Sequence, residues 1–210
     1  MERYKGIVIT VAPSEGGECV VLLDYKRGLV RPVHPEKPSF DRGTFRLMHE
    51  CSFLGEPKPE PWHPEDVKIA LDTLRFTKIL DYNQVKPMLK KHAIDINTFL
   101  ALFQYEKVHP DTYKGPSIIL LPISKQFTLW VDQRPESNKK QAKLLIGNIK
   151  VRITHWFSRD FWNSLKVGDR LEFAKEEGFL IITLSRPYQK DGLCYLLCSG
   201  ILSPYDDWNM

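Results

Sequence analysis

The stretch LSRPYQKDGLCYLLCSGIL, residues Leu184–Leu202, decides how the end of the chain folds. It carries Cys194 and Cys198 inside an apolar run. In a strand the two cysteines would share a face but lie about 13 Å apart, because each of four residues rises about 3.3 Å. That is too far for a shared metal ion, and a disulfide needs Cα atoms within about 7 Å. A helix would bring the thiols together, but Gly192 and Gly200 disfavour one. We therefore interpret the stretch as a turn followed by a buried closing strand, in which both cysteines are packing residues.

Strand-like runs precede this stretch throughout the second half of the chain. Short β-branched or aliphatic segments bounded by Gly, Pro and polar residues are typical of strands. Glu176, Glu177 and Gly178 predict a hairpin turn, and FSRDFWNSLKVGD predicts a short helix ending at Gly168. The predicted strands of this half are SIILLPIS, FTLWVDQ, LLIGNIKVRITHW, RLEFAK and FLIITLS.

The first third of the chain has the same character. Its predicted strands are GIVITV, CVVLL, GLVRPV and a segment within TFRLMHECSFL. The segment APSEGGE between the first two predicts a hairpin loop. Four prolines make GEPKPEPWHPED an extended connector, and VKIALDTLRF fits a strand or a helix equally well.

From Asp81 onward, apolar residues recur at the spacing of a helix. Val85, Met88 and Leu89 stand at helical spacing, with Asp81 as the N-cap. Pro87 predicts a late start or a kink. INTFLALFQYE is a second helical segment.

This layout predicts a mainly β (α+β) protein with two strand-rich modules. We expect an N-terminal β-module at 1–80, a helical connector at 81–115 and a C-terminal β-module at 116–210. Many short strands with Gly and Pro turns fit small barrels or sandwiches.

Composition restricts the partners and the compartment. Lys and Arg outnumber Asp and Glu by 30 to 26, a net charge of +4, so any binding to nucleic acid must come from local basic patches. The apolar run at the N-terminus is short for a signal sequence, and no segment reaches the roughly 20 apolar residues of a membrane span. We expect a cytoplasmic protein with no membrane partner, whose cysteines are free buried thiols.

Catalytic chemistry has only weak candidates. Three His-Pro-acid triplets begin at His34, His63 and His109, and the second gives His63, Glu65 and Asp66 as candidates for a catalytic or metal-assisted site. Proline followed by an acid more often opens a turn, so loop entry is the favoured interpretation. Motifs for nucleophiles, phosphate loops, dinucleotides, zinc proteases and deaminases are absent from the sequence. We expect a non-catalytic protein without cofactor or bound metal, although catalytic residues that converge only in the fold stay open.

Basic and aromatic residues interleave in the C-terminal half. A charged groove that follows phosphates, with aromatic faces on which bases stack, is what single-strand binding requires. The alternative is that the charges are merely solvated and the aromatics belong to the core. The predicted nucleic-acid-binding residues of this half are Arg134, Lys139, Lys140, Lys143, Arg152, His155, Trp156, Arg159, Arg186, Tyr188 and Lys190.

Several short motifs together resemble one known family. GLVRPV, the segment from His63 to Asp66, VRITHW and the closing stretch are similar to motifs of the dual OB-containing domain family of prokaryotic proteins. The resemblance implies two OB-type barrels in tandem and a nucleic-acid-associated role in genomic conflict or defence. Arg186 stands where that pattern has an acid, which makes the last turn more basic.

Three hypotheses for function follow. The leading one is a module that binds single-stranded DNA or RNA, with Arg31 added to the residues above; the alternative for Arg31 is a buried strand end next to Pro32. The second is a protein-interaction subunit of a defence assembly. The third is a nuclease or nucleic-acid-modifying enzyme that uses His63, Glu65 and Asp66.

Overall fold

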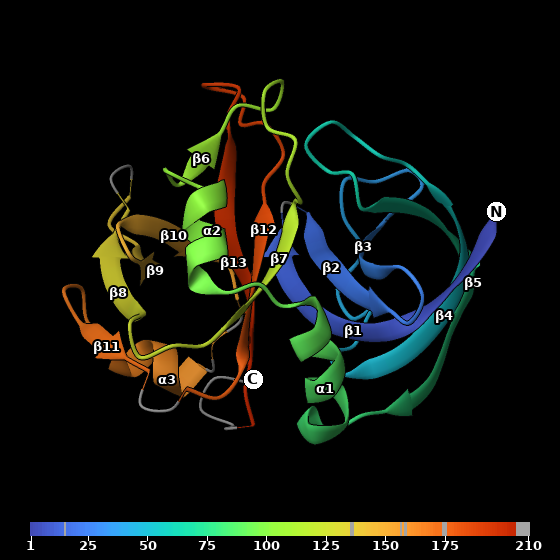
Figure 1. Cartoon of the computed structure of the whole chain (residues 1–210), viewed down its shortest axis with the longest axis horizontal. Helices are drawn as coiled ribbons and strands as arrows, with labels where there is room; N and C mark the ends of the chain where they lie inside the picture. Colours follow the sequence, from blue (N-terminus) through green and yellow to red (C-terminus); the bar gives the residue numbers. More distant parts are fainter. Residues whose placement is uncertain (15, 135–136, 156, 158, 174–175, 205–210) are drawn as a thin grey trace.

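The computed structural model describes residues 1–204 except 15, 135–136, 156, 158 and 174–175. Two β-modules lie side by side, with short helices between them in the sequence (Figure 1). The predicted mainly β (α+β) fold class, with a short helical region between two β-modules, is confirmed. Of the two OB-like barrels predicted, the first module is a closed barrel and the second is an eight-stranded sheet.

The first module is a closed five-stranded barrel. Its order is β1-β2-β3-β5-β4, with β4 pairing back onto β1 and β5 parallel to β3. This is the strand order of an OB-type barrel. The strands are β1 (Glu2–Ser14), β2 (Gly17–Asp24), β3 (Gly28–Val33), β4 (His49–Pro57) and β5 (Asp66–Ile79).

The second module is an eight-stranded sheet that curls on itself. Its order is β11-β8-β9-β10-β13-β12-β7, and β6 pairs with β13. The parallel pair β10–β13 repeats the parallel pair β3–β5 of the first barrel. The strands are β6 (Lys107–Val108), β7 (Ile118–Pro122), β8 (Thr128–Gln133), β9 (Lys140–Ile146), β10 (Ile149–Ile153), β11 (Arg170–Glu172), β12 (Phe179–Leu184) and β13 (Cys194–Leu202).

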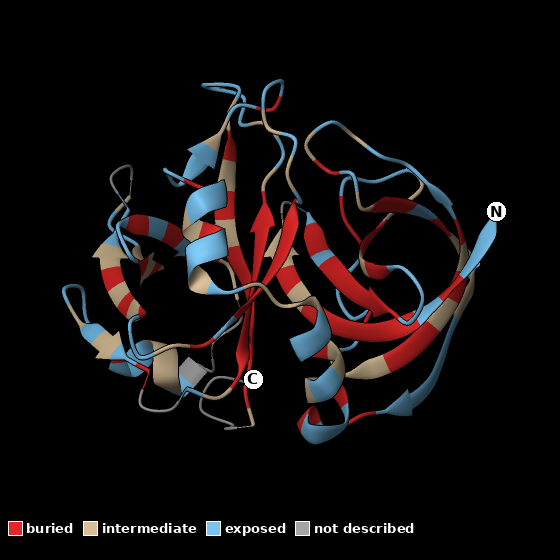
Figure 2. Ribbon diagram, in the orientation of Figure 1, coloured by how far each residue is buried: buried red, intermediate tan, exposed pale blue. Residues whose placement is uncertain are grey.

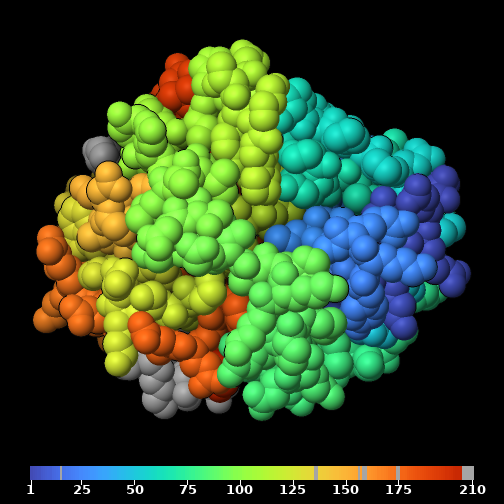
Figure 3. All heavy atoms as spheres, in the orientation of Figure 1, coloured from blue at the N-terminus to red at the C-terminus, as the bar shows by residue number. Residues whose placement is uncertain are grey.

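Two helices connect the modules and a third lies within the second module: α1 (Tyr82–His92), α2 (Ile96–Leu102) and α3 (Arg159–Ser164). Asp81 caps α1 in a capping box with Gln84, as its side chain accepts a hydrogen bond from the Gln84 backbone. In the space-filling view, α1 lies at the join between the modules and α2 lies on the second module beside it (Figure 3).

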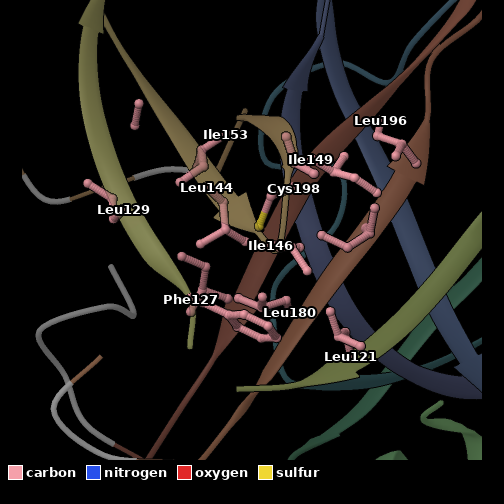
Figure 4. Packing of buried hydrophobic residues seen from close by; sticks show 14 of the residues in the cluster. Leu121, Phe127, Leu129, Leu144, Ile146, Ile149, Ile153, Leu180, Leu196 and Cys198 are labelled. Atoms are coloured by element: carbon pink, nitrogen blue, oxygen red, sulfur yellow. The ribbon is translucent and has the colours of Figure 1, made fainter. Parts of the chain in front are cut away.

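The closing stretch is a buried strand, as predicted. Cys194 and Cys198 both lie in β13, and both belong to the core of the second module. Figure 4 shows the Cys198 sulfur among Leu144, Ile146 and Leu180. Burial raises the pKa of the Cys198 thiol to about 12, so this group is packed and unreactive.

A third apolar cluster joins the modules, and we call it the inter-module core. It combines the outer face of the first barrel, one face of α1 and three strands of the second module. Figure 2 shows buried strands of both modules meeting at the centre of the molecule. Its buried members are Ile7, Ile9, Val21, Leu23, Leu80, Tyr82, Val85, Leu89, Ile118, Leu120, Phe179, Ile181 and Leu202.

The strands β1 and β13 approach closely at this join. Thr10 Oγ1 donates a hydrogen bond to the Ser199 carbonyl at 2.6 Å. A Cβ on Gly200 would lie 2.6 Å from Thr10 Oγ1 and 2.9 Å from Ile181 Cδ1. Only glycine allows this spacing, so the contact between the modules is direct and close-packed.

Several local predictions were wrong. Strands β11 and β12 do not form a hairpin with each other, because β11 pairs with β8 while β12 pairs with β7 and β13. Pro87 lies inside α1, which nevertheless starts directly after its cap. Cys19 is exposed, unlike the other three cysteines. The helix predicted to end at Gly168 ends at Ser164.

Within the described part of the chain, no helix combines the length and the apolar character that a bilayer crossing requires.

Replacing Leu89 by Ala should destabilise the whole chain. Leu89 is 0% exposed in the inter-module core, and a Leu→Ala change in a packed core costs about 2–5 kcal/mol. Lys90→Ala on the same helix is the matched control, since Lys90 is exposed, and it should change stability by less than about 0.5 kcal/mol. Denaturant unfolding measures both, and equal losses would contradict the inter-module core.

Candidate functional site

A cleft of about 1000 Å³ separates the two modules, and we call it the inter-module cleft. One wall is formed by parts of β2 and β3 and by the loop Pro38–Phe40 of the first module. The other wall is formed by β9, β10 and the turn that follows β12. A ligand in this cleft would therefore contact both modules.

Basic side chains project from the sheet wall. Strand β10 alternates buried and exposed residues, which places Lys150 and Arg152 on the same outer face. Lys143 on β9 stands opposite Arg152 and forms an ion pair with Asp132 at 2.7 Å. Among the described residues, neither Lys150 nor Arg152 has an ion-pair partner. Desolvation and then the nearby positive charge of Arg134 lower the pKa of Arg152. Asp132 is the acid that offsets part of this charge, through Lys143 and more weakly Lys150, so the wall keeps a net positive charge among the described residues.

The turn after β12 brings Arg186 and Tyr188 to the cleft, next to Tyr195 of β13. Arg186 crosses toward the first module, where its Nη2 donates a hydrogen bond to the Pro38 carbonyl at 3.2 Å. The Tyr188 backbone N–H donates to the Leu193 carbonyl at 2.9 Å, which fixes the turn. The Tyr188 ring meets Tyr195 edge to face, with centroids 6.2 Å apart, and remains 48% exposed. The turn thus presents the exposed ring of Tyr188, restricted by Tyr195, beside the guanidinium group of Arg186.

Arg31 also lines the cleft but differs from these groups. It is 8% exposed, and its Nε donates a hydrogen bond to Asp66 Oδ1 at 2.6 Å. Arg31 Nη2 also lies 2.5 Å from Asp66 Oδ1, which makes the contact an ion pair. Burial raises the pKa of Asp66 to about 6, and the Arg31 charge opposes that increase. The Arg31 charge is therefore largely neutralised within the protein.

Of the three catalytic candidates only His63 lines the cleft, and each of the three has a partner in the protein. His63 is 2% exposed, and its Nε2 lies 2.9 Å from the Leu184 carbonyl of the second module. Glu65 accepts hydrogen bonds from Ser117 N–H at 2.9 Å and from Ser117 Oγ at 2.6 Å. These bonds tie the connector before β5 to β7 and β12. No group of three or more His, Cys, Asp or Glu side chains in the described residues is arranged to hold a metal ion. A catalytic role for the three residues stays a prediction.

The remaining predicted binding residues are scattered. Lys140 Nζ donates to the carbonyls of Trp162 and Leu165, which docks α3 instead of facing the cleft. His155 lines a separate pocket of about 210 Å³. Trp156 lies outside the described residues, and Arg159 begins α3 with its side chain outside the description. Arg134 and Lys139 are exposed in the β8–β9 loop, and Lys190 is exposed in the last turn.

The structure therefore brings together part of the predicted set, namely Arg31, Lys143, Arg152, Arg186 and Tyr188. Sequence reasoning missed Lys150, which also lines the cleft. The alternation in IKVRI was the available signal, because residues two apart in a strand share a face.

Comparisons with known proteins assign no family. No family model matches the chain, and no curated protein matches it. The crystal structure of the tetrameric p202 HIN2 is similar over 94% of this chain and 87% of that chain, with 6% sequence identity and a TM-score of 0.36. Similarity this low supports no conclusion about function.

The stabilising effect of His63 should depend on pH. Burial, followed by the charge of Arg31, lowers the pKa of His63 from 6.5 to about 3. Below pH 6.5 the imidazole of His63 is protonated in the unfolded chain, whereas in the folded chain it stays neutral down to about pH 3. The contribution of His63 to the free energy of unfolding is therefore lost as the pH falls from 6.5 to about 3. The slope is at most about 1.4 kcal/mol per pH unit.

His63→Gln is the test variant, because its amide can still donate to the Leu184 carbonyl. The stability difference between the native protein and the variant, measured by denaturant unfolding, should shrink from pH 7 to pH 4. Asp66 is present in both proteins, so the difference isolates His63. A difference that is constant with pH would contradict the neutral buried imidazole.

Proposed function

We propose that the protein binds single-stranded nucleic acid, DNA or RNA, in the inter-module cleft and acts there as a non-catalytic binding module. The observation that carries the proposal is the convergence of Lys150, Arg152 and Arg186 on one cleft, with no ion-pair partner for any of them among the described residues.

Electrostatics supports a polyanionic ligand. Two guanidinium groups, those of Arg134 and Arg152, are close enough for one to lower the pKa of the other. Like charges held together without a counter-ion raise the energy of the free protein. Phosphate groups would relieve this repulsion and release their own counter-ions, which gives salt-dependent affinity.

The aromatic turn supports a single strand over a duplex. Tyr188 offers nearly half its surface beside Arg186, and its contact with Tyr195 restricts the ring. Unpaired bases have free faces that can stack on such a ring. In a duplex those faces are stacked on each other, so only backbone contacts would remain.

The family assignment belongs to the same proposal. Each module contains one parallel strand pair, β3–β5 in the first and β10–β13 in the second, and the OB fold binds oligonucleotides on one sheet face and in its loops. With the motif resemblance, this supports membership of the dual OB-containing domain family and a role in prokaryotic conflict or defence.

Removing cleft cations should weaken binding and flatten its salt dependence. Arg152→Ala and Arg186→Ala should each lower the slope of log K against log salt by about 0.7, the value for one phosphate contact on a single strand. Fluorescence anisotropy of labelled oligonucleotides across about 50–200 mM salt measures this slope.

Lys26→Ala is the matched control, since Lys26 is exposed in the β2–β3 turn, outside the cleft lining, and carries the same charge. An equal loss in Lys26→Ala would mean that net charge alone governs binding. Binding by the native protein that ignores salt over this range would contradict the proposal.

The Tyr188 ring should matter more than its hydroxyl. Tyr188→Ala should cost about 1–3 kcal/mol of binding free energy, the value for one base on an aromatic side chain, while Tyr188→Phe should cost little. The same titrations with single-stranded and duplex ligands measure this. Equal losses on both ligands would argue against stacking by Tyr188.

A further inference from the structure

Trp130 lies on the outer face of β8 and does not line the inter-module cleft. Its side chain is half-buried, between the buried Leu129 and Val131. Three cations surround its ring. Lys143 Nζ is 5.6 Å, Lys150 Nζ 5.0 Å and Arg170 Cζ 5.7 Å from the ring centroid. They come from β9, β10 and β11, so the sheet itself gathers them.

This cluster is continuous with the cleft wall. Trp130 stands opposite Lys143, and Lys143 stands opposite Arg152. Neighbouring strands are about 4.8 Å apart, so the row from Trp130 to Arg152 spans roughly 10 Å. Lys143 and Lys150 line the cleft as well as flanking the ring. A chain leaving the cleft over β10 and β9 would reach Trp130 without crossing an uncharged surface.

The charges around the ring are only partly balanced by acids, because one carboxylate, Asp132, faces three cations and its pKa is lowered by Lys143 and, more weakly, by Lys150. Asp132 pairs with Lys143. For Lys150 and Arg170, the described residues supply no ion-pair partner. The attraction of each cation to the ring accounts for part of the arrangement. Attraction to the ring does not offset the repulsion between the cations. An anionic ligand would offset that repulsion.

We propose that a single strand bound in the cleft continues across the outer face of β8–β10 and stacks a base on Trp130, with Lys150 and Arg170 on the flanking phosphates. This inference rests on the proposed function and extends its footprint. Lysine ammonium groups sit on flexible stems, so a base can move them from the ring to phosphates while the strands stay in place. An acidic protein segment would use the cations but would not need the flat indole face.

The test is a length series of oligothymidylates of about 4–16 nucleotides, the range of site sizes of OB folds. Trp130→Ala should weaken binding of the longest strand by about tenfold and leave the shortest nearly unchanged. Trp130→Phe keeps a stacking ring and should stay within about threefold of the native protein. It should also remove part of the tryptophan fluorescence quenching that accompanies binding. Arg152→Ala, a cleft variant, should weaken short and long strands alike.

Each outcome decides between named alternatives. Equal loss on all lengths, or the same loss for heparin, a polyanion without bases, would overturn stacking on Trp130 while leaving the cleft proposal intact. Polyglutamate binding that depends on Trp130, with oligonucleotide binding that does not, would assign this face to a protein partner and also overturn it. No binding of any strand by the native protein would overturn both proposals. Equal melting temperatures of Trp130→Phe and the native protein exclude unfolding as the cause.

Discussion

The packing of aliphatic side chains from β1, β2 and α1 against β7, β12 and β13 determines the relative position of the two modules. Each module has its own core, but the outer face of the first barrel is also apolar, and Ile7, Ile9 and Leu23 must be buried against a partner. The second module supplies Ile118, Leu120 and Ile181, while α1 closes one side with Val85 and Leu89. The cleft lies beside this contact, so its width and the positions of its cationic walls follow from apolar packing.

Buried polar groups fix the register of that packing. Apolar surfaces are non-directional and could slide past each other. The hydrogen bonds from Thr10 to Ser199, between His63 and Leu184, and from Ser117 to Glu65 each have one favourable geometry. A slip would leave these groups unpaired away from water, at about 1–3 kcal/mol each. His63 and Glu65, which were weak catalytic candidates in the sequence, therefore contribute contacts that position the two modules.

Sequence reasoning succeeded where the signal is local. Strand spacing placed Cys194 and Cys198 in a buried strand, and Asp81 with its apolar periodicity placed α1. It failed where pairing depends on distant segments. Glu176, Glu177 and Gly178 favour a hairpin between the strands on either side. In the structure β11 pairs with β8 and β12 pairs with β13, which are distant in the sequence. The cleft could not be predicted because Arg186 and Pro38 meet only after the modules dock. Lys140 was predicted to bind nucleic acid because it belongs to a basic loop sequence. In the structure its ammonium group donates to the Leu165 carbonyl and holds α3 in place.

The shared core has a consequence for how the chain comes apart. A module cut from its neighbour would expose a contiguous aliphatic face to water, and surfaces of that kind drive association with other chains. The two modules are therefore poor candidates for independent expression, although each has a core of its own. The two modules should fold and unfold cooperatively, because α1 packs against both of them in the inter-module core.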